Sequence, residues 1–222
     1  MIPKDIEKIT EADLQTLIDN SVMEGKTIEY KLALPGNSDS EKKEFLADVS
    51  SFANATGGDL IYGILSDNST GFPKSLDGVA CQNIDQEVSR IDNILRDGIE
   101  PRISTCHIQP VRLSNGTFAI IIRIPKSWLS PHRVSYKTHD RFYSRSSNGK
   151  YSLDVSELRI AFNLSEATTE RIRRFRESRI SKVLSEETPV PMGSSAKIIM
   201  HLVPYASFSP AHAFDFSRIT SW

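Results

Sequence analysis

The chain has 222 residues, of which 39% are hydrophobic and 25% are charged, a composition typical of a soluble globular protein with one sizeable domain. Its longest apolar run, residues 118–122, is too short to cross a bilayer, and residues 1–8 lack the apolar stretch of a signal peptide, so we expect no membrane partner and a cytoplasmic location. Only Cys81 and Cys106 occur, which argues against a disulfide framework and a cysteine-rich zinc site.

Charge is distributed unevenly along the chain. Residues 1–101 carry 9 Lys/Arg and 19 Asp/Glu, whereas residues 102–183 carry 16 and 6, so the net charge of −1 conceals an acidic half and a basic segment. A basic segment supplies what a polyanion-binding surface needs, because phosphate contacts give most of the non-specific affinity for nucleic acid. The alternative is that folding interleaves the two halves and pairs their charges.

The first half of the chain predicts alternating helices and strands. Thr10 and Asp13 have the spacing of a capping box and open a predicted helix that runs to about residue 20. Strands are predicted at 27–32 and 59–65. A helix is predicted over 41–56, where apolar residues recur with helical spacing at Phe45, Leu46, Val49, Phe52 and Ala53.

The second half predicts a helix, a strand pair and a long basic stretch. Ser114-Asn115-Gly116 is a hairpin signal between two predicted strands, and the second of these reads as buried on both faces. The predicted elements are a helix over 84–95, strands at 102–113 and 117–125, a loop over 125–138, a strand at 141–145, a helix over 154–163, a basic helix over 165–184 and a strand at 197–203.

Three acids around the first two predicted strands are candidate metal ligands. Glu24 and Glu29 lie five residues apart, and Gly25 permits the bend that would let them meet. Asp67 follows the second strand, and Lys31 would share one face of the first strand with Glu29. Three carboxylates could hold a hard divalent cation that activates water or stabilises a leaving oxygen at a phosphodiester. The alternative is that all three are solvated surface acids.

Basic and aromatic residues further along are candidates for nucleic-acid binding. Arg141, Tyr143 and Arg145 alternate on one face of a predicted strand, where a ring flanked by guanidinium groups could stack a base or follow a backbone. His132 could serve as an acid or base, or it could order its loop. The predicted nucleic-acid-binding set is Arg133, Lys137, Arg141, Tyr143, Arg145, Lys150, Arg173 and Arg174.

Several short motifs follow one another at characteristic spacings. They are Glu24, residues 27–31 (TIEYK), residues 44–58 (EFLADVSSFANATGG), residues 60–64 (LIYGI), Pro125-Lys126-Ser127, Pro131-His132-Arg133 and residues 141–146 (RFYSRS). Their order and spacing resemble the Alba-like domain of the Schlafen family, in its bacterial single-lobe type, over roughly residues 20–165. The resemblance implies an α+β fold, with a mixed sheet and helices packed on it.

The resemblance, together with the composition of the chain beyond it, predicts a division into segments. We expect the Alba-like domain to be followed by a basic helix, a linker and the start of a C-terminal region that this sequence truncates. The expected segments are an N-terminal helix over 1–22, the Alba-like nucleic-acid-binding or nuclease domain over 23–165, the basic helix over 166–184, the linker over 185–196 and the C-terminal region over 197–222.

Nuclease members of the family imply a function for this chain. The resemblance places a metal-dependent endoribonuclease site at Glu24, Glu29 and Asp67, with Mg²⁺ or Mn²⁺ bound and Lys31 steadying developing charge. No zinc is expected, because the cysteine/histidine set of the vertebrate members is missing. ATP is not expected either, because Gly57-Gly58 lies outside any phosphate-binding loop motif and suits a helix end.

Three hypotheses therefore stand. The first is an endoribonuclease that cleaves tRNA or other structured RNA, in phage defence or a stress response, as a homodimer whose basic surfaces form a groove. The second is a non-catalytic DNA- or RNA-binding module of a transcriptional regulator. The third is a structural dimerisation domain. Metal-dependent cleavage would mark the first, and salt-sensitive binding without cleavage would mark the second.

Overall fold

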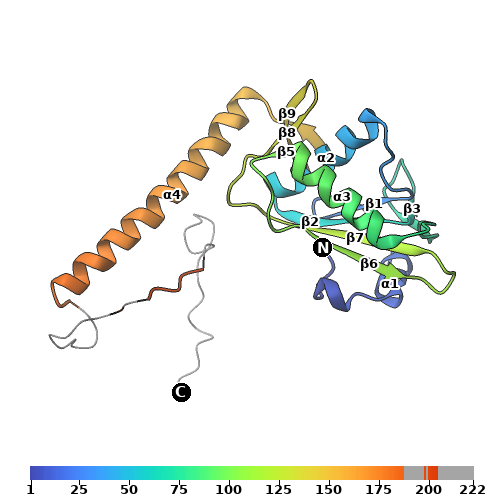
Figure 1. The fold of residues 1–222 in the computed structure, drawn as a ribbon, viewed down its shortest axis with the longest axis horizontal. Helices are drawn as coiled ribbons and strands as arrows, with labels where there is room; N and C mark the ends of the chain where they lie inside the picture. The colour runs from blue at the N-terminus through green and yellow to red at the C-terminus, as the bar shows by residue number, and fades with distance from the viewer. Residues whose placement is uncertain (188–197, 199, 205–222) are drawn as a thin grey trace, which may run out of the picture. The chain divides into compact units, whose positions relative to one another are not determined.

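The computed structural model describes residues 1–187, 198 and 200–204, and it divides the chain into two compact units, Met1–Ala161 and Phe162–Trp222. The fold is α+β, as predicted (Figure 1). The first unit contains a short 3-10 helix, η1 (Ile6–Lys8), three complete α-helices, the first residues of a fourth and ten strands. The three complete helices are α1 (Glu11–Asp19), α2 (Asp39–Asn54) and α3 (Ile84–Gly98).

Four strands form the central mixed sheet, in the order β1-β2-β7-β6. β1 pairs with β2 in parallel, and the remaining pairs are antiparallel. The predicted hairpin is present, because β6 and β7 pair antiparallel on either side of residues 113–117. The bounds are β1 (Ile28–Lys31), β2 (Gly57–Tyr62), β6 (His107–Arg112) and β7 (Phe118–Pro125).

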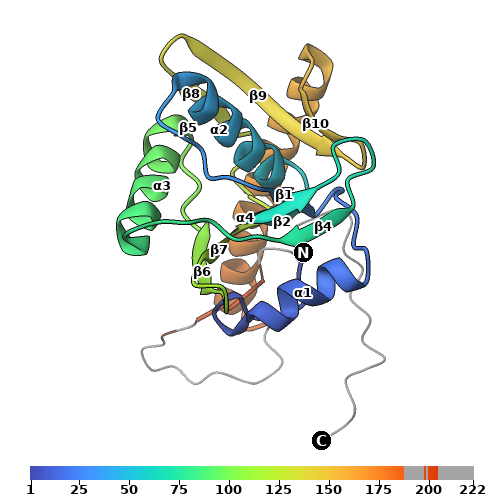
Figure 2. The ribbon, with the colours of Figure 1, turned by 90° about the vertical axis from the view of Figure 1, so that its right-hand side faces the viewer.

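A second sheet has the order β10-β9-β8-β5, and β3 and β4 form a separate pair. Figure 2 shows the long strand β9 running beside α2, and α2 packs against both β9 and β2. The bounds are β3 (Ile64–Ser66), β4 (Pro73–Leu76), β5 (Ile99–Glu100), β8 (Arg133–Tyr136), β9 (His139–Ser146) and β10 (Gly149–Ser152).

The central sheet is buried on both faces, which confirms the prediction for its strand β7. Ile120 and Ile122 pack with α2 and α3 on one face, and Ala119 and Ile121 pack with α1 on the other. Figure 1 shows α2 and α3 on the opposite side of the sheet from α1. The helix predicted over 41–56 is confirmed as α2, and its five predicted core residues are all buried.

Four local predictions differ from the structure. The expected loop over 125–138 contains β8, because residues 133–136 pair with β9. The predicted strand at 59–65 is divided into β2 and β3 at Gly63, whose φ of +94° interrupts an extended chain. The two helices expected over 154–163 and 165–184 are one continuous helix, α4 (Val155–Leu184).

The fourth difference concerns the C-terminal strand. Ile198 and residues 200–203, which are the described part of the strand predicted at 197–203, are in no regular element. Most of the predicted linker, and residues 205–222, lie outside the described residues. None of the helices in the described part of the chain combines the length and the apolar character that a membrane span requires.

Candidate functional site

Glu24 is fixed at a bend of the chain just before β1. The predicted turn at Gly25 brings the Glu24 carboxylate back over the strand, where its Oε1 accepts a hydrogen bond from the backbone N–H of Tyr30 (2.9 Å). The same oxygen accepts from the Ser66 hydroxyl (3.1 Å), and the backbone N–H of Glu24 donates to the carbonyl of Gly71 (2.8 Å). Glu24 therefore joins β1 to the segment that follows β3.

Glu29, within β1, is a buried carboxylate with both oxygens paired. Its Oε1 lies 2.7 Å from Nζ of Lys31, and its Oε2 accepts a hydrogen bond from Nη2 of Arg145. The Arg145 guanidinium also lies over the ring of Phe52, 3.8 Å from its centroid. Burial acts to raise the pKa of Glu29, but the charges of Arg145 and Lys31 outweigh burial and hold that pKa below its ordinary value.

Asp48, on α2, is a second buried acid beside Glu29. It is 1% exposed, and its two oxygens lie 2.6 Å from Nζ of Lys150 and 3.4 Å from Nζ of Lys31. Lys150 also pairs with Glu44, one turn earlier on α2. Burial and the nearby charge of Glu29 raise the pKa of Asp48 to about 6. One buried carboxylate thus holds two lysines from different strands.

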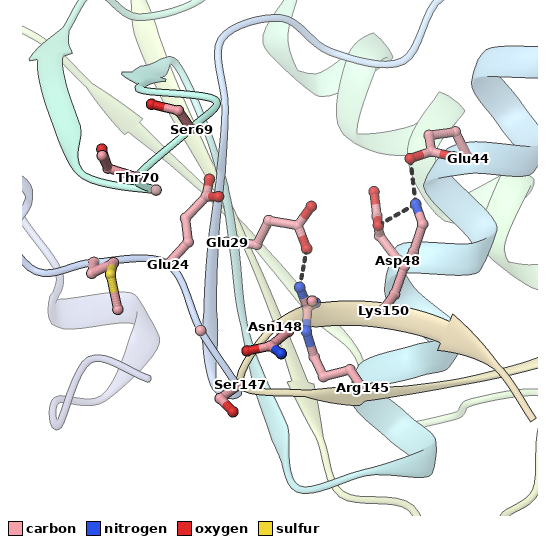
Figure 3. A pocket seen from close by; sticks show the side chains of 14 residues that line it. Glu24, Glu29, Glu44, Asp48, Ser69, Thr70, Arg145, Ser147, Asn148 and Lys150 are labelled. Atoms are coloured by element: carbon pink, nitrogen blue, oxygen red, sulfur yellow. Dashed lines mark hydrogen bonds and ion pairs between the residues drawn. The ribbon is translucent and has the colours of Figure 1, made fainter.

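These side chains surround a cavity of about 430 Å³ (Figure 3). Figure 3 shows Glu24 beside the Ser69–Thr70 turn, Glu29 directed toward Arg145, and Asp48 and Glu44 directed toward Lys150. The cavity is therefore rich in charge, with more acids than bases. The charged residues that line it are Glu24, Glu29, Glu44, Asp48, Arg145 and Lys150.

Asp67, the third predicted metal ligand, does not line this cavity. Its Oδ1 accepts from the backbone N–H groups of Ser69 (2.9 Å) and Thr70 (3.1 Å), and its Oδ2 lies 2.7 Å from Nζ of Lys74. The hydrogen bond from Lys74 is the main reason that the pKa of Asp67 lies below its usual range. Within residues 1–187, 198 and 200–204, no three acidic, histidine or cysteine side chains are grouped so as to hold a metal ion.

The predicted nucleic-acid-binding strand at 141–145 lies within β9, and its three alternating residues do not share one exposed face as predicted. Arg145 is 5% exposed and Tyr143 packs partly buried beside the core, because this face of β9 covers α2 instead of facing solvent. Arg141 is exposed near the other end of β9. Lys150, on β10, lines the cavity with Arg145. The three alternating residues thus run from the surface into the interior.

The remaining predicted nucleic-acid contacts lie on the surface with acidic neighbours. Arg133 pairs with Glu100 at 2.7 Å, and Lys137 pairs with Asp39. In the second unit, Arg173 and Arg174 are exposed on α4, and both approach Glu170. The pairing of the basic segment with the acidic half is extensive, at Arg123–Asp59, Arg133–Glu100, Lys137–Asp39, Arg145–Glu29 and Lys150–Asp48.

Of the two roles considered for His132, acid–base chemistry and ordering of its loop, the structure favours the second. It is fully buried, its Nδ1 lies 2.6 Å from the carbonyl of Pro101, and its backbone N–H donates to Oδ1 of Asn54 (2.7 Å). The amide nitrogen of Asn54 donates to the carbonyls of His132 (2.9 Å) and Tyr143 (2.8 Å). His132 does not line the cavity, so it is placed to fix a loop.

The sequence did not reveal Asp48 and Glu44 as cavity residues. Both lie on α2, four residues apart, so they share one helix face. The available signal was Asp48 itself, which is an acid between Phe45 and Val49 on the core-facing side of a predicted helix. A charge at such a position requires a buried partner, and the partner, Lys150, is 102 residues away.

The comparisons with known proteins agree with the motif pattern. The family model described as "Schlafen, AlbA_2" matches residues 24–154, which is more than half of the chain. The chain belongs to this Schlafen family. No curated protein matches the Schlafen chain at a significant level.

The solved structures that are similar to this Schlafen chain include two that are each 18% identical to it. A crystal structure of a protein from Corynebacterium diphtheriae is 18% identical, with a TM-score of 0.42, and the match covers 64% of this chain and 26% of that chain. The solution structure of the N-terminal domain of a RecG-related protein from Nitrosomonas europaea is 18% identical, with a TM-score of 0.36, and the match covers 50% of this chain and 71% of that chain. The Schlafen chain thus spans only a minor part of the Corynebacterium protein.

Proposed function

We propose that this Schlafen chain is a metal-dependent endoribonuclease that cleaves tRNA or another structured RNA at the cavity containing Glu24 and Glu29. The supporting observation is the composition of that cavity. Glu24, before β1, and Glu29, within β1, share it with the cationic groups of Arg145 and Lys150. Acids that can act on water, placed beside cations that can stabilise a phosphate, are the combination that phosphodiester cleavage uses.

The carboxylates of the cavity suit Mg²⁺ or Mn²⁺ in donor chemistry, since both ions prefer oxygen ligands. Four carboxylates and two cationic side chains line the cavity, so its net charge is negative. A phosphodiester that enters would make this net charge more negative, and a bound divalent cation could offset it. Glu24 and Glu29 would hold the ion, which when bound polarises a phosphate and lowers the pKa of water. Asp67 does not fit as a ligand in this conformation, because Lys74 and its own turn occupy its oxygens.

Two cationic residues hold Glu29 in place in this proposal. Arg145 fixes the direction of the Glu29 carboxylate through a bond that crosses from β9 to β1. Lys31 lies on the same face of β1 and is held by both Glu29 and Asp48, which sets its ammonium group beside the acids. Lys31 itself lines the neighbouring cavity and not this one, so the sequence-based placement of its ammonium group at the phosphate is not met in this conformation. The fixed cations that line this cavity are Arg145 and Lys150, and such cations can stabilise charge that develops on a phosphate without first reorganising.

A non-catalytic nucleic-acid-binding module of a transcriptional regulator is the second candidate. It is favoured by the pairing of both Glu29 oxygens and both Asp67 oxygens within the protein, which leaves fewer ligands for a metal ion. Under either candidate we propose that two copies associate to form a groove for folded RNA. Under the first, we propose that the nuclease acts in phage defence or a stress response. Light scattering that gives a strict monomer would contradict the groove.

Cleavage of a total tRNA pool tests the proposal. Wild type, Glu24→Gln, Glu29→Gln and the exposed control Asp19→Asn would each be incubated with Mn²⁺, Mg²⁺ or EDTA. We expect discrete cleavage by wild type and Asp19→Asn that requires metal, and its loss in both glutamine variants. Because Glu29→Gln also removes a buried ion pair, Glu24→Gln is the decisive variant. Intact tRNA that binds in a salt-sensitive way would favour the binding module instead.

A further inference from the structure

A second cavity, of about 400 Å³, adjoins the cavity that contains Glu24 and Glu29. The two share Glu44 and Asp48 in their walls. We infer that the second cavity receives one unpaired nucleobase of the RNA, next to the phosphate that the first cavity holds. The inference rests on the proposed function and names a feature of its substrate.

Asp48 is the partition between the two cavities. Lys150, on one of its oxygens, lines the first cavity, and Lys31, on the other oxygen, lines the second. The two ammonium groups are therefore separated by a single carboxylate. A nucleotide whose phosphate lies near Lys150 would have its sugar and base within reach of the space beyond Lys31.

The walls of the second cavity suit the flat apolar face of a base. Leu34, Pro35, Phe45 and Tyr62 contribute to them, and these residues are apolar or aromatic. Phe45 and Tyr62 are almost completely buried and pack against each other with ring centroids 6.4 Å apart. The walls are thus formed before any ligand binds, and a preformed apolar cavity with a few polar groups is typical of a small-ligand site.

Polar side chains at the cavity suit the edge of a base. Ser40 and Glu44 lie on successive turns of α2, and both line it. The carboxylate of Glu44 can accept a hydrogen bond from an exocyclic amino group, such as that of cytosine. A base within a duplex cannot enter, because its faces are covered by its neighbours, whereas loops and single strands present free bases. The site thus selects an unpaired nucleotide.

Binding of two uncleavable oligomers tests this inference. The probes are a 2′-O-methyl oligocytidine and an abasic oligomer of the same length and charge. Ala33→Trp places a large ring in the exposed mouth of the second cavity, and Ala12→Trp, at an exposed position of α1, is the matched control. Affinities are measured by fluorescence anisotropy at one fixed salt concentration, because phosphate contacts vary with salt.

We expect Ala33→Trp to weaken oligocytidine binding by about tenfold, the scale of one lost base-stacking contact, and to leave the abasic oligomer unchanged. Ala12→Trp should change neither affinity. An equal loss for both probes, no loss for either, or no binding of oligocytidine by wild type would overturn the inference. Cleavage of tRNA by wild type is measured separately. If wild type cleaves tRNA but the base-site test fails, only this inference is overturned and the nuclease proposal stands.

Discussion

Arg145 and Glu29 form a buried ion pair that ties β9 to β1 across 116 residues of sequence. The pair lies at the wall of the cavity, and the Arg145 guanidinium is also stacked on Phe52 of α2. A single side chain therefore connects the second sheet, the central sheet and the helix between them. The orientation of the candidate catalytic acid depends on the packing of the domain core.

Arg145→Met should destabilise the protein strongly, because it leaves Glu29 buried with only Lys31 as a counter-charge. Breaking a buried pair by removing one partner costs about 3 kcal/mol or more in the free energy of unfolding. The exposed Arg96–Asp92 pair on α3 provides a control, and Arg96→Met should change stability by less than about 1 kcal/mol. Urea denaturation measures both. Equal losses in the two variants would show that the Arg145 pair does not stabilise the core.

Asp48→Asn should weaken RNA binding through the two lysines that Asp48 holds. If Asp48 acts by positioning Lys31 and Lys150, its substitution should have little further effect in a Lys31→Met/Lys150→Met background. A double-mutant cycle on the dissociation constant should therefore give a coupling energy of about 1 kcal/mol or more. Additive effects would instead indicate that Asp48 acts on the fold as a whole.

Local signals predicted the elements of this domain, whereas long-range pairing decided which residues reach the cavity. The capping box at Thr10 and the spacing of Phe45 and Val49 on α2 each depend on residues a few positions apart, and each is confirmed. The burial of Arg145 depends on a partner in β1 and a ring in α2. No pattern within β9 distinguishes an arginine that binds RNA from one that pairs with a buried acid.

The candidate site likewise combines residues that local sequence signals bring together with one whose position depends on long-range pairing. The bend at Gly25 was visible in the sequence, and the structure places Glu24 and Glu29 in the walls of one cavity. Whether Asp67 lies with them depends on the turn after β3, where Lys74 of the neighbouring strand β4 forms an ion pair with the Asp67 carboxylate. A register shift between β3 and β4 occurs at this point, and such irregularities cannot be read from local propensity.

His132 should make stability depend on pH near and below the ordinary pKa of histidine. Burial lowers its pKa, and the hydrogen bond with Pro101 only partly offsets this, so the unfolded chain binds a proton at pH values where the native state does not. The contribution of His132 to the free energy of unfolding should therefore fall as the pH decreases through about 6.5, the ordinary value for histidine. His132→Asn should flatten this slope in urea denaturation at several pH values.

The exposed His107 provides the control for that pH series. His107→Asn removes a histidine that the fold does not bury, so it should keep the slope of the wild type. An unchanged slope in His132→Asn would mean that another group causes the pH dependence.

Asn54→Ala should destabilise the protein, because it removes the hydrogen bonds that connect α2 to the loop before β8 and to β9. Its side chain makes three hydrogen bonds, to the backbone N–H and carbonyl of His132 and to the carbonyl of Tyr143. At about 1 kcal/mol for each lost bond, the variant should lose roughly 3 kcal/mol of stability. Asn93→Ala, at an exposed position of α3, should be nearly neutral. A neutral Asn54→Ala would show that other contacts hold this loop.

Paramagnetic broadening by Mn²⁺ can locate the proposed metal site in solution without relying on activity. Substoichiometric Mn²⁺ would be added to isotope-labelled wild type and Glu24→Gln, and backbone amide signals would be compared. If Glu24 and Glu29 hold the ion, the signals of Gly25 and Asn148, which line the cavity, should broaden selectively in wild type and not in the variant. Broadening that is absent, or identical in both proteins, would contradict a metal-dependent site in this cavity.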